Sequence, residues 1–181
     1  MMPVIPQTRF RRRLGLLAFI ACACISTNES RAQDRRPPLQ RSPVPIACPE
    51  SEPEETRGEA TRARGGRIAL RRGHALDIPG QAMREERDAP NFTVRRRASD
   101  HLKVEVRATN GTGRYEFTRP ALLTLDWSAC PDPENPELLE VFQVDPETDS
   151  ILSGPLPVVR RTRQSITVQL NHLSAYIVAI P

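Results

Sequence analysis

His-Leu-Lys-Val-Glu-Val-Arg-Ala, residues 101–108, is the stretch of this sequence that decides its fold class. Apolar side chains at every second position, from Leu102 to Ala108, alternate with the charged side chains of Lys103, Glu105 and Arg107. A period of two over a full strand length predicts a β-strand with one buried face and one exposed face. Residues 109–113, Thr-Asn-Gly-Thr-Gly, come next and predict a turn, because Asn and Gly tolerate positive φ.

The same alternation recurs on both sides of this strand, and turn residues separate the runs. Because no segment after residue 32 has sustained helical periodicity, we expect a single antiparallel β-sandwich of about eight strands. The expected strands contain Ile68 and Leu70, Phe92 and Val94, 102–108, 114–118, 123–127, 138–144, 166–170 and 176–180. The aromatic residues that we expect in its core are Phe92, Tyr115, Phe117, Trp127, Phe142 and Tyr176.

The N-terminal residues 1–32 have the three parts of a secretory signal peptide. Arg9 and residues 11–13 form a positive region, and residues 14–25 form an uncharged apolar run. Ser30 and Ala32 then place small residues before a cleavage site that precedes Gln33. As a helix the apolar run would be about 18 Å long, too short for a bilayer core of about 30 Å. We therefore expect export to the periplasm or the extracellular space.

An alternative processing route passes through Cys22. Residues 19–22, Phe-Ile-Ala-Cys, loosely match the sequence at which bacterial lipoproteins are lipidated on cysteine. Only in this case would the protein have the membrane as a partner, through a lipid anchor on Cys22.

The net charge of the chain comes from this leader. The whole chain has 26 Lys+Arg and 22 Asp+Glu, and the leader holds five arginines and one acid. Cleavage before Gln33 would leave 21 basic and 21 acidic residues, because 26 − 5 = 21 and 22 − 1 = 21. A neutral mature chain gives no electrostatic argument for a nucleic-acid partner.

Two cysteines, Cys48 and Cys130, remain after the leader is removed. In an exported chain an even pair predicts a disulfide, and two free thiols are the alternative. The bridge would be worth about 4 kcal/mol in the chain-entropy model. The two residues are 82 positions apart, without a Cys-x-x-Cys motif, so their spacing is not that of a zinc site.

Residues 33–65 are rich in proline and charge, and we expect a disordered linker there, followed by the domain at residues 66–181. Ile46 and Cys48 are the part of the linker that we expect to dock onto the domain. A short helix over residues 54–64 is an alternative, although it would have no apolar face.

Four segments resemble, in order, conserved segments of the ZU-five-like β-sandwich domains. They are Leu76–Ala82 (LDIPGQA), Phe117–Leu125 (FTRPALLTL), Val141–Asp145 (VFQVD) and Asn171–Ala179 (NHLSAYIVA). Domains of this family occur beside ankyrin repeats, in netrin receptors and in exported bacterial proteins. The resemblance implies a sandwich over about residues 66–181 and a role in interaction or scaffolding.

Some members of that family cleave themselves at a His-Phe-Ser element, where the histidine helps the serine to attack the preceding carbonyl. Here the element is His172-Leu173-Ser174, so the resemblance implies cleavage between Leu173 and Ser174 as an alternative function. Such chemistry needs a strained peptide bond and an oriented base. The interpretation that we favour is that His172 and Ser174 bond backbone groups where the last strand begins.

Other polar residues do not form a recognisable site in the sequence. His74, His101 and His172 share no ligand spacing, and nothing requires Asp77, Asp126 and Asp145 to meet. The basic runs at 95–97 and 160–163 fit solvated strand ends better than an anion site. No phosphate loop, nucleophile elbow or zinc-protease motif is present, so we expect no cofactor, no metal and no enzymatic activity.

The sequence therefore predicts an exported, non-enzymatic interaction or structural module of the cell envelope. Its partner would be a protein or another envelope component that the sequence does not identify. The alternatives are the self-cleaving domain and a glycan-binding sandwich, which aromatic side chains exposed on one face would indicate.

Overall fold

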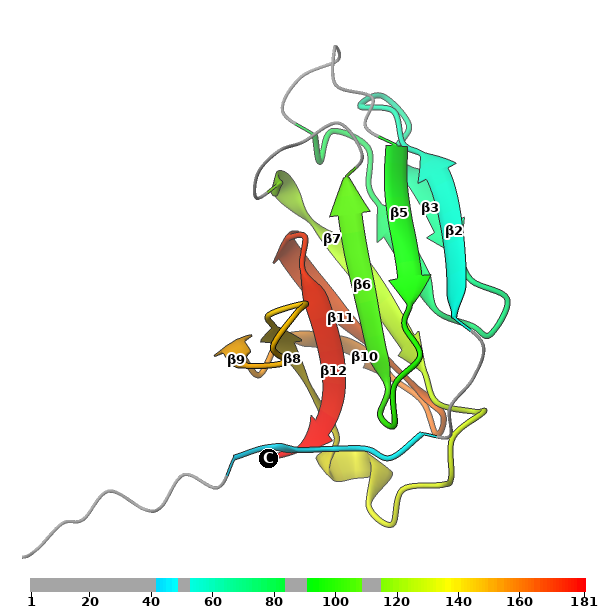
Figure 1. Ribbon diagram of the computed structural model, residues 1–181. Helices are drawn as coiled ribbons and strands as arrows, with labels where there is room; N and C mark the ends of the chain where they lie inside the picture. The colour runs from blue at the N-terminus through cyan, green and yellow to red at the C-terminus, as the bar shows by residue number, and fades with distance from the viewer. Residues whose placement is uncertain (1–41, 49–52, 84–90, 109–114) are drawn as a thin grey trace, which may run out of the picture. The chain divides into compact units, whose positions relative to one another are not determined.

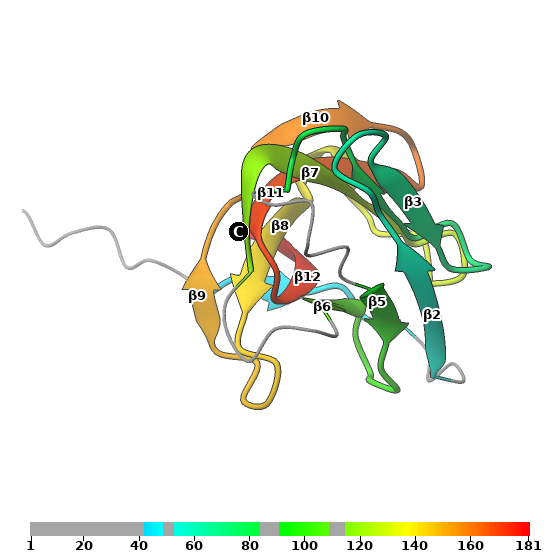
Figure 2. The ribbon, with the colours of Figure 1, turned by 90° about the horizontal axis from the view of Figure 1, so that it is seen from above.

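A computed structural model describes residues 42–48, 53–83, 91–108 and 115–181. These residues form two antiparallel β-sheets that pack face to face, as Figures 1 and 2 show. The predicted all-β sandwich is confirmed. The predicted leader, with Cys22, and the turn at 109–113 lie outside the described residues.

The larger sheet has the strand order β2-β5-β6-β12-β8-β9, and β1 pairs with the far end of β12. Its strands are β1 (Val44–Pro45), β2 (Glu54–Glu59), β5 (Asn91–Arg96), β6 (Lys103–Ala108), β8 (Glu140–Val144), β9 (Ile151–Ser153) and β12 (Ala175–Ile180).

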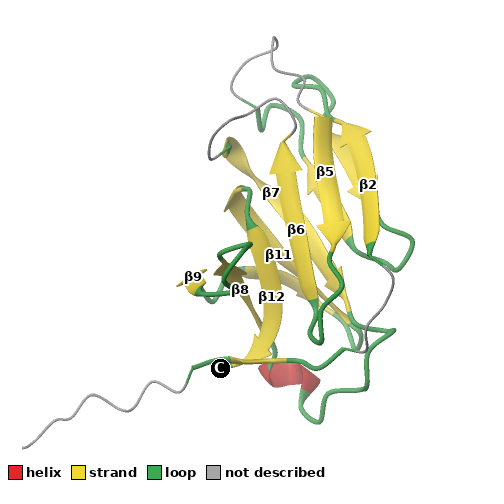
Figure 3. Cartoon of the chain, viewed as in Figure 1, coloured by secondary structure: helices red, strands yellow, loops and turns green. Residues whose placement is uncertain are grey.

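The smaller sheet has the order β10-β11-β7-β4-β3. Its strands are β3 (Gly66–Ala69), β4 (Ala75–Ile78), β7 (Glu116–Asp126), β10 (Val158–Arg161) and β11 (Ser165–His172). A short 3-10 helix, Pro136–Leu138, lies in the loop before β8 (Figure 3).

The strand count is higher than the predicted eight, because short edge strands have no clear alternation. Residues 114–118 and 123–127, expected as two strands, belong to the single strand β7, which runs through Pro120. The pairing of β7 with β11 shifts register between Leu170 and His172, close to this proline. A proline cannot donate to the ladder, so a local irregularity there is expected.

The core between the sheets is built from alternating residues of both. The predicted inward positions are confirmed in β6, where Val104 and Val106 are buried in the main core, but Lys103 and Glu105 on the side predicted to be exposed are buried as well. The predicted core aromatics are buried as well, except Tyr115, which is half-buried and packs edge-to-face on Phe92.

Strands β8 and β12 are buried on both faces. Tyr176 and Val178 of β12 pack into the main core. The opposite side carries a second apolar cluster, which consists of Phe142, Val144, Ala175, Ile177 and Ala179. These central strands therefore appear in the sequence as almost continuous apolar runs.

The prediction of a linker up to residue 65 is wrong for residues 53–65. All six residues of β2 pair with β5, so the domain includes this segment, and the alternative of a helix is wrong too. The inward positions of β2 are Glu54, Thr56 and Gly58, so no apolar alternation marks it as a strand. Backbone pairing holds it, and Gly58 lies so close to β3 that an added Cβ would be 2.5 Å from Ile68 Cγ1.

The start of the domain is anchored as predicted. Ile46 and Cys48 are buried, and Cys48 forms a disulfide with Cys130. The bridge joins the segment after β1 to the loop that follows Trp127, across 82 residues of sequence.

Candidate functional site

The outer surface of strands β2, β5 and β6 is the most highly organised polar surface among the described residues. Alternation along β5 turns Phe92, Val94 and Arg96 inward, where each is buried, and leaves Thr93 and Arg95 outward. The basic run 95–97 is thus divided between two faces, and it is not simply a solvated strand end. We refer to the outer surface of β2, β5 and β6 as the charged face.

Strand register arranges the charged face in two rows that cross the sheet. In one row Arg95 lies between Glu55 of β2 and Glu105 of β6. In the neighbouring row Thr93 lies between Arg57 and Arg107. Strands β2 and β6 therefore both carry a Glu-x-Arg triplet at the same level of the sheet.

Within each triplet the glutamate holds its own arginine. Arg57 donates from Nε and Nη2 to Glu55 Oε1, at 3.1 and 3.0 Å. Arg107 donates from Nε to Glu105 Oε1. Cross-strand and same-strand pairs of opposite charge fix these long side chains in place.

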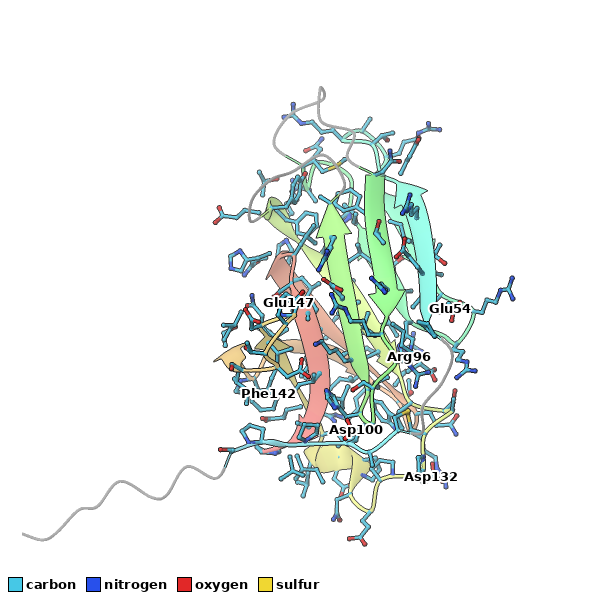
Figure 4. The ribbon with its side chains drawn as sticks, in the orientation of Figure 1. Glu54, Arg96, Asp100, Asp132, Phe142 and Glu147 are labelled. Atoms are coloured by element: carbon cyan, nitrogen blue, oxygen red, sulfur yellow. A yellow bond between two sulfur atoms is a disulfide. The ribbon has the colours of Figure 1, made fainter. Side chains whose placement is uncertain are left out.

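Glu105 is the most unusual member of the face, because only 2 % of its side chain is exposed. Arg107 binds one of its oxygens, and Arg97 donates from Nε to the other at 2.9 Å. A buried carboxylate is tolerated only where such charge-assisted bonds compensate its lost hydration. Glu147, labelled in Figure 4, completes the cluster by binding Arg97 at 3.4 Å.

A shallow hollow lies over this face, with a volume of about 200 Å³. It is lined by Glu55, Arg57, Thr93, Arg95, Glu105, Arg107 and Ala108. The floor is therefore polar and charged, and the charges come from three adjacent strands.

A second ionic group fastens the turn after β8 to the start of β6. Lys103, almost fully buried, donates from Nζ to the carbonyl of Pro146 at 2.8 Å and to Asp149. His101 lies beside it, with Nδ1 2.7 Å from Asp100 Oδ1 and Nε2 3.6 Å from Asp149 Oδ2. These contacts link the turn to the sheet from which the second apolar cluster is built.

A third polar group, Arg96 and His74, is buried, and its arginine contacts the disulfide. Arg96 donates from Nη2 to the sulfur of Cys48 at 3.0 Å. Burial lowers the pKa of Arg96, and the neighbouring charge of Arg72 adds to this effect. His74, completely buried, accepts a hydrogen bond at Nδ1 from the N–H of Asp126 at 3.1 Å. Burial, with the charge of Arg96 second, lowers the pKa of His74 to about 4, so the ring is neutral at pH 7.

His172 and Ser174 occupy the junction between β11 and β12, but their side chains do different things. Ser174 Oγ donates to the carbonyl of Val144 at 3.1 Å. The backbone carbonyl of His172 accepts from the hydroxyl of Tyr176 at 2.5 Å, while His172 Nδ1 is buried and has no hydrogen-bond partner. The serine therefore bonds a backbone group, as the favoured interpretation expected, and the histidine ring does not.

The remaining polar residues singled out in the sequence are not brought together. Asp77 pairs with Arg67, at 3.1 Å. Asp126 accepts from Ser128, and Asp145 accepts from the N–H groups of its own turn. In the part of the chain that the structure describes, no group of three or more His, Cys, Asp or Glu side chains is arranged to hold a metal ion.

The charged face cannot be predicted from the sequence, because it depends on the register with which β2 and β6 pair with β5. The Glu-x-Arg triplet of β6 is visible as the polar side of an alternating strand. Its counterpart, Glu55-x-Arg57, falls in a segment that was expected to be a linker. The signal that could have joined them is the repeated triplet itself, but only the pairing of both strands with β5 places the two at one level.

Searches against protein-family models, curated proteins and solved structures found no match. Among the described residues there is no helix long and apolar enough to cross a membrane.

Proposed function

We propose that this protein is an exported, non-enzymatic interaction module of the cell envelope that binds its partner through the charged face. The observation that carries the proposal is the buried carboxylate of Glu105, held by two arginines on the outside of a sheet. Burying a charge at the surface has a cost, and the benefit is a fixed arrangement of the arginines around it.

The compartment is part of the same proposal. The disulfide between Cys48 and Cys130 supports an oxidising environment, as found in the periplasm and outside the cell. The leader sequence supports export by the ordinary secretory route, with a lipid anchor at Cys22 as the alternative.

The contacts of Ser174 support an interaction module more than a self-cleaving one. Self-cleavage needs a serine hydroxyl that its base can deprotonate. Here the hydroxyl proton of Ser174 is directed to the carbonyl of Val144, on another strand.

A glycan-binding sandwich receives less support, because sugar-stacking aromatics are not found on an outer face of the described residues. Trp127 and Phe92 are completely buried, and Phe117, Phe142 and Tyr176 are at most 8 % exposed. Tyr115 is half-buried and packs against Phe92 and Phe117.

We retain the likeness to ZU-five-like domains as a proposal. Its four segments fall on β4, β7, β8 and the β11–β12 junction, which are inner strands of the two sheets. Such positions support a shared sandwich framework, and the role in interaction or scaffolding follows from that likeness.

Site-specific photo-crosslinking in the native cell tests the proposal. A photoreactive residue would replace Arg95 on the charged face or, as a control, Gln169, which is exposed on the outer side of β11. We expect a discrete crosslinked species from position 95 and none from position 169. Crosslinks from position 169 alone, or none from either position, would contradict an interaction through this face.

A further inference from the structure

One row of the charged face has the composition of an anion site. Thr93 lies at the centre of the row, with Arg57 on the neighbouring strand on one side and Arg107 on the other. Strands β2 and β6 are two strand spacings apart, so the two arginine backbones are separated by about 9–10 Å. Arginine side chains are long enough to reach across this distance from both sides of the shorter threonine.

Each arginine retains donors after its contact with glutamate. A guanidinium has five N–H donors, and a carboxylate oxygen held at Nε uses only one or two of them. Glu55 and Glu105 therefore fix the orientation of Arg57 and Arg107 and leave N–H groups for a further acceptor. Both arginines and Thr93 line the same hollow.

We propose that the Arg57–Thr93–Arg107 row binds a single tetrahedral oxyanion, a phosphate or sulfate group, carried by the partner of the charged face. This rests on the proposed function and names the chemistry that the face recognises. Two guanidinium groups provide paired N–H donors to separate oxygens of the anion, and the threonine hydroxyl provides one further donor.

The acidic residues around the row restrict the ligand to an isolated group. Glu55 and Glu105 lie in the adjacent row, and Oε1 of Glu147 lies 3.9 Å from Arg107 Nη2. A continuous polyanion laid across the sheet would meet all three carboxylates, whereas one phosphate or sulfate in the hollow would meet only Glu55 and Glu105, each already paired with an arginine. Glu147 competes for Arg107, so it weakens the site.

The test is a titration of the purified mature protein with sodium phosphate and with sodium sulfate, followed by amide chemical shifts in nuclear magnetic resonance spectra. We expect saturable shifts at residues 57, 93 and 107. Arg57→Gln and Arg107→Gln should each weaken binding by about tenfold, because each removes charge-assisted hydrogen bonds. Thr93→Val, which keeps the β-branched shape, should weaken it less.

Two further variants distinguish specific binding at this row from nonspecific attraction of the anion to any exposed arginine. Arg67→Gln removes an arginine of similar exposure that is also paired with a carboxylate, but on the smaller sheet, so it should leave the affinity unchanged. Glu147→Gln should strengthen binding, because it frees Arg107. Equal losses in Arg67→Gln and Arg107→Gln, or no saturable shifts in the wild type, would overturn the proposal.

The origin of the oxyanion is distinguished by two additional ligands. Vesicles that contain phosphatidylglycerol present the phosphate on a lipid surface, and dextran sulfate presents sulfate as a dense polymer. Binding of inorganic phosphate with weak binding of dextran sulfate is the expected pattern, and tight Arg107-dependent binding of dextran sulfate would contradict an isolated group. Photo-crosslinks from position 95 that persist in Arg107→Gln would refute the oxyanion site and leave the interaction module standing.

Discussion

His74 shows how one buried side chain controls the stability of this sandwich. Nδ1 of its ring accepts a hydrogen bond from the backbone N–H of Asp126, and Nε2 is buried without a hydrogen-bond partner. Desolvation, then the positive charge of Arg96, lowers its pKa from 6.5 to about 4, although Asp126 and Glu54 act in the opposite direction. The folded state therefore binds a proton at His74 only at a lower pH than the unfolded chain does.

We expect the free energy of unfolding to fall as the pH is lowered from about 6.5 to about 4. In this window the unfolded chain binds a proton at His74 and the folded chain does not, so protons favour unfolding. The full effect is roughly 3 kcal/mol at pH 4, since one pKa unit is worth about 1.4 kcal/mol. Urea denaturation at a series of pH values measures it.

His74→Asn provides the control for this titration, because asparagine offers an acceptor near the position of Nδ1 and does not titrate. Its unfolding free energy should fall less than that of wild type between pH 6.5 and 4, because the contribution of His74 is missing. Wild-type and variant curves of the same slope in that window would contradict the assignment to His74.

Glu105 is the residue on which the charged face depends for its order. Glu105→Gln should lower the free energy of unfolding by about 1–3 kcal/mol, because two arginines lose their shared carboxylate. Glu55→Gln is the matched control, and it should cost less than about 1 kcal/mol, since its partners are more exposed. Chemical denaturation of both variants checks the difference, and equal costs would show that Glu105 is not specially placed.

A substitution of Ser174 distinguishes the interaction module from the self-cleaving domain. We expect wild type and Ser174→Ala to keep the full mass of the mature chain, because the serine hydroxyl is bonded to Val144. Denaturing mass spectrometry checks this. Loss of residues 174–181 from wild type but not from Ser174→Ala would move the protein to the self-processing class.

At the scale of elements, the sequence predicts those strands whose inward positions are apolar. Strand β6 is predictable because Val104 and Val106 alternate with charged residues. Strand β2 is not, because its inward side is Glu54, Thr56 and Gly58. The charged face was out of reach for the same reason, since Glu55 and Arg57 lie on β2 and the rows of the face are set by pairing between strands.

The close contact of β2 with β3 gives an element-scale prediction. Gly58→Ala would place a Cβ 2.5 Å from Cγ1 of the β-branched Ile68, so the two strands must separate. We expect a loss of about 1–3 kcal/mol of stability, in the range for overpacked cores. Thermal denaturation measures the loss.

A double-mutant cycle with Ile68→Ala identifies its cause. The cost of Gly58→Ala should largely disappear in the Ile68→Ala background, because the opposing atom is gone. An undiminished cost there would point to the backbone of β2 and not to this contact.

At the scale of the whole molecule, the disulfide joins the segment after the first strand to a loop 82 residues later in the chain. Replacing Cys48 and Cys130 with serine should lower the free energy of unfolding by about 4–5 kcal/mol in the chain-entropy model. Arg96, which contacts the sulfur of Cys48, would then face a hydroxyl. Denaturant titrations of the serine variant and of wild type measure the cost, and unreduced wild type that alkylates at two thiols would contradict the bridge.

The position of β12 has a consequence for how the protein is made. This strand lies between β6 and β8 in the middle of the larger sheet, yet it comes after every other strand in chain order. A polypeptide that emerges from a ribosome or a translocation channel with its N-terminus first holds β5–β6 and β8–β9 as separate hairpins until residues 175–180 arrive. The larger sheet can therefore be completed only after β12, the last strand of the chain, has emerged.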